Sequence, residues 1–124
     1  MNQTQRDIQF MELRPDIVID ENRASLDQET FQNEALRPIL KLQNNIILHF
    51  FSLKIAEVSS PTDPKEKLLF IENTIRKDAV LRNQLIGCVI GLFTFEEFSY
   101  YLQNSSSLNK RISQLLIKRI QDQL

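Results

Sequence analysis

Two residues of this chain have the types needed for a nucleophile and its base. His49 and Cys88 are the single histidine and the single cysteine, and a paired cysteine and histidine can carry out covalent catalysis. However, His49 lies within the apolar run IILHFF, and Cys88 lies within LIGCVIG. A free cysteine among apolar neighbours behaves as a small buried hydrophobe unless a charged group activates its thiol. We therefore predict packing roles for both residues and no catalytic residue.

Carboxylates are the other residues that could line a site. Glu96 and Glu97 are adjacent, and Glu34 and Glu57 lie elsewhere in helical patterns. No helix carries the Glu-x-x-His pattern of carboxylate-bridged metal bundles. Glu97 also stands three residues after Thr94, the spacing of a helix capping box. We therefore assign Glu97 a structural role and predict no metal and no cofactor.

Composition places the chain among single-domain helical proteins. Its 124 residues are 42% hydrophobic and 25% charged, with a formal net charge of −1, so nothing global favours nucleic acid or an anionic membrane as partner. Only two glycines and four prolines argue against a β-rich fold, which needs more turn residues. The N-terminus MNQTQRDIQF is polar, and no apolar run approaches the roughly 18 residues of a membrane span. We expect a cytoplasmic protein without membrane contact.

The longest helical pattern runs over residues 27–58 and would position most of the core. Apolar residues recur there at steps of three and four, which keeps them on one face of a helix; they are Phe31, Ala35, Ile39, Leu42, Ile46, Phe50 and Leu53. Pro38 removes a backbone donor and crowds the preceding turn. We expect one long helix kinked near 34–38. The alternative is a short helix over 27–36 followed by a second helix that starts at Pro38.

Further helices follow the central one, each with a start signal. Asp63, Asp78 and Thr94 are good N-cap residue types, and Pro64 suits the first position of a helix. The expected helices cover 64–77, 79–93, 95–103 and 107–123. The predicted fold is therefore an all-α, single-domain bundle of about five helices with a long, Pro-kinked central helix.

The first 26 residues differ from the rest. Residues 1–30 carry seven acidic against three basic residues. One or two helical turns are expected over 4–12, ended by Arg14 and Pro15. The cluster at 17–19 is too short for more than an extended segment. We therefore divide the chain into a partly extended N-terminal arm, 1–26, and a helical bundle domain, 27–124.

Two segments look apolar on most of their circumference, 38–58 and 79–93, and one small bundle cannot enclose both. Some apolar area should stay exposed in a monomer, and such patches usually mark an interface. The candidate interface residues are Ile46, Ile47, Phe50, Phe51, Ile86, Ile90 and Phe93. Gly87 and Gly91, four residues apart, favour a close helix crossing inside the bundle over a contact between copies. We expect a non-enzymatic protein that acts by protein–protein contact as a homodimer.

Two other functions compete with this hypothesis. The first is a small-molecule or lipid-binding bundle whose pocket is lined by the phenylalanines at 50, 51, 93, 95 and 98. The weaker one is a transcriptional regulator that uses the basic residues of the last helix. These are Lys110, Arg111, Lys118 and Arg119, opposed by Asp122. Because they are few and a solvated helix face explains them, we do not expect nucleic acid as a partner.

Three strings carry a resemblance that covers most of the chain. They are FQNEALRPILKLQN at 31–44, GLFTFEEFSYYLQN at 91–104 and LNKRI at 108–112. Together they resemble a group of short, uncharacterised bacterial all-helical proteins, some of which are labelled glyoxalase. Metal-dependent glyoxalases are built from βαβββ units or metallo-hydrolase folds and need several histidine and glutamate ligands. With one histidine in this chain, the resemblance implies no catalytic residues.

Overall fold

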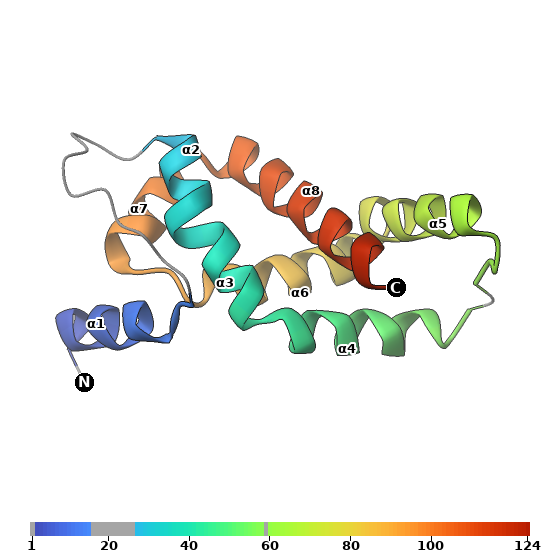
Figure 1. Cartoon of the computed structure of the whole chain (residues 1–124). Helices are drawn as coiled ribbons and strands as arrows, with labels where there is room; N and C mark the ends of the chain where they lie inside the picture. The colour runs from blue at the N-terminus through green and yellow to red at the C-terminus, as the bar shows by residue number, and fades with distance from the viewer. Residues whose placement is uncertain (1, 16–26, 59) are drawn as a thin grey trace.

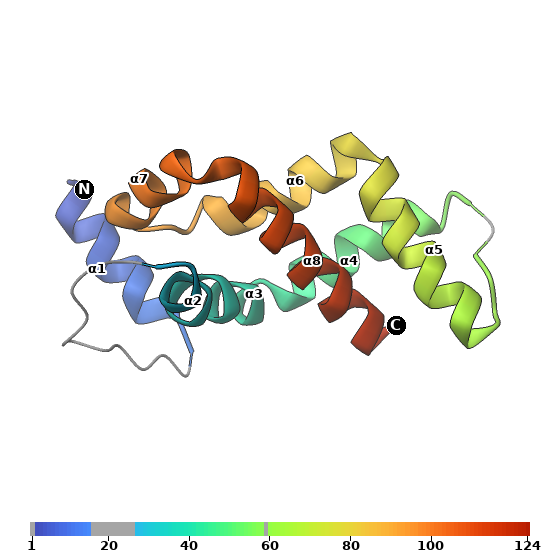
Figure 2. The same cartoon turned by 90° about the horizontal axis from the view of Figure 1, so that it is seen from above.

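The computed structural model describes residues 2–15, 27–58 and 60–124. Its helices form an elongated bundle, with α1 and α7 at one end and α5 at the other (Figures 1 and 2). In chain order the elements are α1 (Gln3–Leu13), α2 (Gln28–Phe31), the π-helical η1 (Gln32–Leu36), α3 (Arg37–Leu42), α4 (Asn44–Ile55), α5 (Pro64–Lys77), α6 (Ala79–Ile90), α7 (Phe95–Gln103) and α8 (Ser105–Gln123).

The predicted all-α class is confirmed, since the described residues contain helices and no strand. All three predicted N-caps form, that of Asp78 by accepting from the Leu81 N–H at 3.0 Å. Asp63 accepts from the Glu66 N–H at 3.1 Å, and Thr94 and Glu97 make a reciprocal capping box. The expected count of about five helices is too low, because the central pattern divides and the N-terminal arm adds a helix of its own. Within the described ranges, no helix is both long and apolar enough to cross a bilayer.

The central helix is not the single kinked rod that was expected. Residues 34–37 stay helical, with η1 leading directly into α3, and Pro38 occupies the first turn of α3. The chain turns instead at Gln43, between α3 and α4 (Figure 1), where φ and ψ are −90° and 7°. The prediction of a kink at 34–38 is therefore wrong. The alternative is met in part: an element boundary falls between Leu36 and Arg37 and Pro38 lies in the first turn of α3, but the helical run is continuous across that boundary.

Side chains from elsewhere in the chain explain both features. Pro38 has no N–H for the Glu34 carbonyl four residues earlier, and Arg14 Nη1 donates to that carbonyl at 3.1 Å. At the real bend, Gln43 Nε2 donates to the Cys88 carbonyl at 3.0 Å. The backbone around the proline is therefore satisfied without a kink, and the bend is tied to α6.

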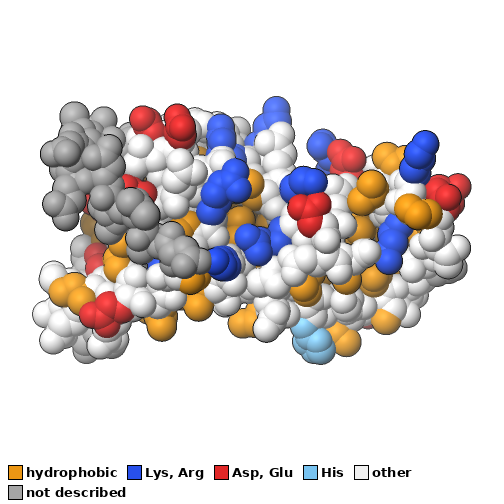
Figure 3. All heavy atoms as spheres, in the orientation of Figure 1, with side chains coloured by type: hydrophobic (Ala, Val, Ile, Leu, Met, Phe, Trp, Pro, Cys, Tyr) orange, Lys and Arg blue, Asp and Glu red, His pale blue; other side chains and the backbone are white. Residues whose placement is uncertain are grey.

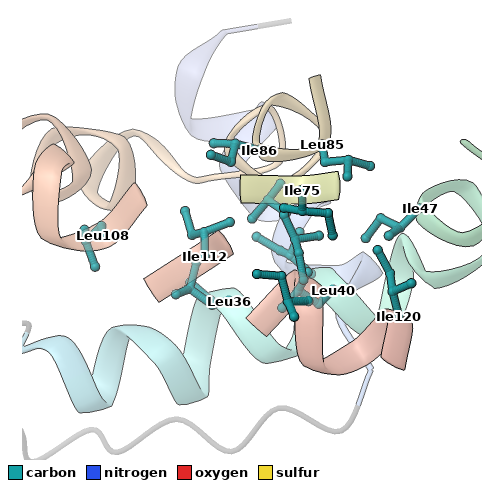
Figure 4. Close-up of a cluster of buried hydrophobic side chains, with 14 of the residues drawn as sticks. Leu36, Leu40, Ile47, Ile75, Leu85, Ile86, Leu108, Ile112 and Ile120 are labelled. Carbon is teal, nitrogen blue, oxygen red and sulfur yellow. The ribbon is translucent and has the colours of Figure 1, made fainter. Parts of the chain in front are cut away.

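The core is built around α8, which packs against α5, α6 and α7. Its inward face has a helical repeat, and these four side chains have no exposed area: Leu108, Ile112, Leu116 and Ile120. Figure 4 shows Leu108, Ile112 and Ile120 in one cluster with side chains from the central run, such as Leu36 and Leu40, and from α5 and α6. One continuous core therefore joins these elements.

The N-terminal arm is helical where the structure describes it. Its helix, α1, covers three turns, more than the one or two expected over 4–12, and it ends at Leu13, just before Arg14 and Pro15. Residues 16–26, which include the expected extended cluster at 17–19, lie outside the described residues. The extended part of the arm and the domain boundary at 26 stay predictions.

Candidate functional site

The seven predicted interface residues divide between the core and the surface. Buried are Ile47, Phe51, Ile86 and Phe93; half-buried are Phe50 and Ile90; exposed is Ile46. The four buried side chains pack within a single chain. Of the seven predicted residues, the exposed one is therefore on α4.

One side of α4 is apolar and uncovered. Ile46 and Leu53 have 55% and 59% of their area exposed, with half-buried Phe50 and exposed His49 between them. Steps of three and four residues place these side chains on one side of a helix, and we call them the α4 face. Hydrophobic side chains lie along the molecular edge formed by α4 (Figure 3). The opposite side, with Ile47 and Phe51, faces the core.

The α4 face also lacks formal charge. From position 42 to 53 the sequence is LQNNIILHFFSL, with no Lys, Arg, Asp or Glu. Lys54, just beyond it, forms a 3.4 Å ion pair with Asp78 at the start of α6. The surface formed by residues 42–53 therefore offers a partner an apolar contact that requires no charge of opposite sign.

Asp78 holds the junction of α5 and α6. Its side chain accepts from the Leu81 N–H at 3.0 Å as the N-cap of α6. The bond from the Leu81 backbone, helped by nearby Lys54, keeps the pKa of Asp78 below its usual value of 3.8. The charged carboxylate is therefore the form that the fold favours at this position.

The chemistry-bearing residues are engaged structurally or lie apart. His49 is exposed on α4, contrary to its predicted packing role, whereas Cys88 is half-buried in α6. The carboxylate of Glu97 is occupied by the Thr94 N–H at 2.8 Å and by Arg14. Among the residues that the structure describes, no three His, Cys, Asp or Glu side chains gather as a metal site would require.

Sequence reasoning missed Arg14. This side chain is buried at the end of α1, and its Nη1 and Nη2 donate to the two oxygens of Glu97 at 2.7 and 2.5 Å. It also donates to the Leu92 carbonyl at 3.3 Å. The capping pattern identified Glu97, but nothing local identifies a partner 83 positions away. Arg14 therefore anchors the N-terminal arm to α7.

Two α1 side chains, Arg6 and Asp7, also join the N-terminal arm to the connection between α6 and α7. Arg6 donates to the carbonyls of Phe93 at 2.8 Å and of Gly91 at 3.1 Å. Both acceptors lie just after α6, which ends at Ile90, three residues earlier than expected. Asp7 accepts from the Phe95 N–H at the start of α7. The positive Arg6 thus lies at the C-terminal end of α6 and the negative Asp7 at the N-terminal end of α7, where the helix dipoles favour these charges.

The pocket expected among phenylalanines exists in part. A cavity of about 360 Å³ opens between α1 and the α6–α7 connection, and Phe93, Phe95 and Phe98 line it. Phe50 and Phe51 belong to α4 and are not among its lining residues. The aromatic pocket is therefore lined by fewer phenylalanines than predicted and lies at the end of the bundle.

Gly87 in α6 and Gly91, the residue that follows α6, do not mark a tight crossing. Both Gly87 and Gly91 are exposed. A Cβ atom built at Gly87 meets nothing within 4 Å, and one at Gly91 meets only the Gly87 carbonyl, at 3.2 Å. The expectation of a close crossing inside the bundle is therefore wrong, because no other helix in the described part of the chain comes within 4 Å of a Cβ atom at either glycine.

Comparison with known proteins adds no assignment. The chain matches no family model, no curated protein and no solved structure. The likeness to short bacterial helical proteins stays a prediction.

Proposed function

We propose that this chain works through protein–protein contact, as a homodimer in which the α4 face meets its own two-fold copy. The observation that supports this proposal is the exposure of Ile46 and Leu53 on one side of a helix whose other side is already in the core. Contiguous apolar patches larger than roughly a few hundred Å² are uncommon on soluble monomers and usually mark an interface, and the α4 face is the start of such a patch. Covering them removes apolar area from water and favours association.

A second copy is the occupant that fits this surface. In a two-fold contact every side chain near the axis meets its own equivalent, so a charged face would repel itself. Residues 42–53 carry no formal charge, which removes that penalty. Nor is there a charge on this face to select a partner of opposite sign.

Cross-linking tests the geometry of the contact. In a Cys88→Ser background, Ile46→Cys places a single thiol on the α4 face. A short bis-maleimide should then join two chains within minutes at micromolar protein concentration, because the two-fold axis brings both thiols together.

The matched control is Leu69→Cys in the same background. Leu69 is 58% exposed, close to the value for Ile46, but lies on α5. It should give little dimer under the same conditions. Equal yields from both positions, or no cross-linked dimer from Ile46→Cys, would contradict the proposal.

The aromatic pocket supports a second candidate, a small-molecule or lipid-binding protein. Three of the five phenylalanines predicted to line a pocket do so, around a cavity of about 360 Å³, a size within the range of ligand sites. Saturable binding of an apolar fluorescent dye, abolished by Phe98→Asp but unaffected by Leu69→Asp, would support it. Binding that both variants retain would count against this pocket.

A further inference from the structure

A different cleft lies between α3 and α8 and encloses about 310 Å³. Leu40 from α3 and Leu115 from α8 supply apolar lining, and Arg37, Lys118 and Arg119 supply positive charge. Figure 3 shows basic side chains gathered over these two helices. The sequence had placed Lys118 and Arg119 on a solvated face of the last helix, without a partner from the central run.

The charge of the cleft is unbalanced. Among the described residues that line it, three cationic side chains are opposed by one carboxylate, that of Asp122, which contacts Lys118 at 2.9 Å. Both members of that pair are largely exposed, and exposed pairs of this kind contribute little. Lys118 can therefore exchange this contact for a ligand.

One cation is held in place. Arg119 Nη1 donates to Asn44 Oδ1 at 3.0 Å, and the Asn44 amide makes reciprocal bonds with Gln123 at 2.8 and 2.7 Å. This network joins the start of α4 to the end of α8. Arg119 uses one N–H in this network, and a guanidinium has five N–H donors. The Arg119 side chain is therefore held in position and keeps donors for a ligand.

We propose that this cleft binds a small phosphate monoester that carries a compact apolar group. Three cations against one carboxylate suit a dianion better than a single carboxylate ligand, and guanidinium groups bind phosphate oxygens in pairs. Leu40 and Leu115 would contact the apolar group. The volume is at the lower end of the range for ligand sites, which favours a small molecule. This site is independent of the α4 face.

Calorimetric titration with phenyl phosphate tests the proposal. The folded chain should bind one equivalent saturably at low ionic strength, and bind it more tightly than inorganic phosphate, which lacks the apolar group. Benzyl alcohol, which lacks the anion, should give no heat of binding. Added KCl should weaken the interaction through screening.

Variants separate this cleft from general attraction to a basic surface. Arg119→Gln and Arg37→Gln should each weaken binding about tenfold or more, since each removes charged donors. Arg37 is exposed, so its replacement should leave the fold unchanged even if Arg119→Gln does not. Asp122→Asn should tighten binding several-fold by removing the opposing carboxylate.

Lys110→Gln is the control, because Lys110 is an exposed cation of α8 outside the cleft. The Lys110→Gln variant should bind phenyl phosphate with the same affinity as the unaltered chain. The proposal is overturned if phenyl phosphate does not saturate, if inorganic phosphate binds equally well, or if Lys110→Gln weakens binding as much as Arg37→Gln.

Discussion

Arg14 and Glu97 form a buried, two-point ion pair that joins the N-terminal helix to α7. The two N–O distances are 2.7 and 2.5 Å, and the side chains are 0% and 9% exposed. The same guanidinium donates to the Glu34 carbonyl near Pro38. One arginine therefore connects the arm, the central run and α7, and its removal should be felt in all three.

Removing one member of this pair should be severe. Glu97→Gln leaves the Arg14 charge buried without a carboxylate, which typically destabilises a protein by about 3–5 kcal/mol. Urea unfolding at a fixed protein concentration measures the loss. The exposed Lys118→Met should change stability by less than about 0.5 kcal/mol.

The double variant Arg14→Met with Glu97→Gln should lose less stability than the two single losses added together. Neither member then leaves an unpaired buried charge, and contacting residues are not additive. If the two losses of stability add strictly, Arg14 and Glu97 have no coupling free energy, and this result would contradict a stabilising ion pair.

Gly87→Ala should stabilise the chain by about 0.5–1 kcal/mol, the usual gain for replacing a mid-helix glycine. A Cβ there meets open space, whereas one at Gly91 lies 3.2 Å from a carbonyl. Gly91→Ala should therefore gain less. A loss of stability in Gly87→Ala would instead place a close contact, such as a second copy, against this side of α6.

The stability contributed by Asp78 should depend on pH. Because the fold keeps the pKa of Asp78 below 3.8, its contribution is fully present above that value and is lost as pH falls through the lowered pKa. Asp78→Ser keeps a capping oxygen but cannot titrate. The stability difference between the unaltered chain and Asp78→Ser should shrink below pH 3.8; a difference that does not vary with pH would contradict this account.

Local patterns sufficed for much of the fold. The caps at Asp63 and Thr94 involve residues three positions apart, so the sequence contains both partners side by side. The bend at Gln43 was missed because its side chain bonds to a carbonyl 45 positions away. The kink at Pro38 was wrongly expected because Arg14, from another helix, supplies the missing donor.

The candidate site was only half predictable for a related reason. Periodicity identified α4 as apolar on most sides, but which side faces the core depends on the helices that cover it. Those helices bury Ile47 and Phe51 and leave Ile46 and Leu53 exposed. The cleft between α3 and α8 likewise required two segments, far apart in sequence, to meet.

Sedimentation equilibrium of the unaltered chain tests the central claim most directly. Across micromolar concentrations the account predicts a mass twice that of the 14.6 kDa chain. Ile46→Lys should reduce it to one chain by burying an unpaired charge at the contact, whereas Leu69→Lys should remain dimeric. A single-chain mass for the unaltered protein throughout this range, or a dimer that survives Ile46→Lys, would contradict association through the α4 face.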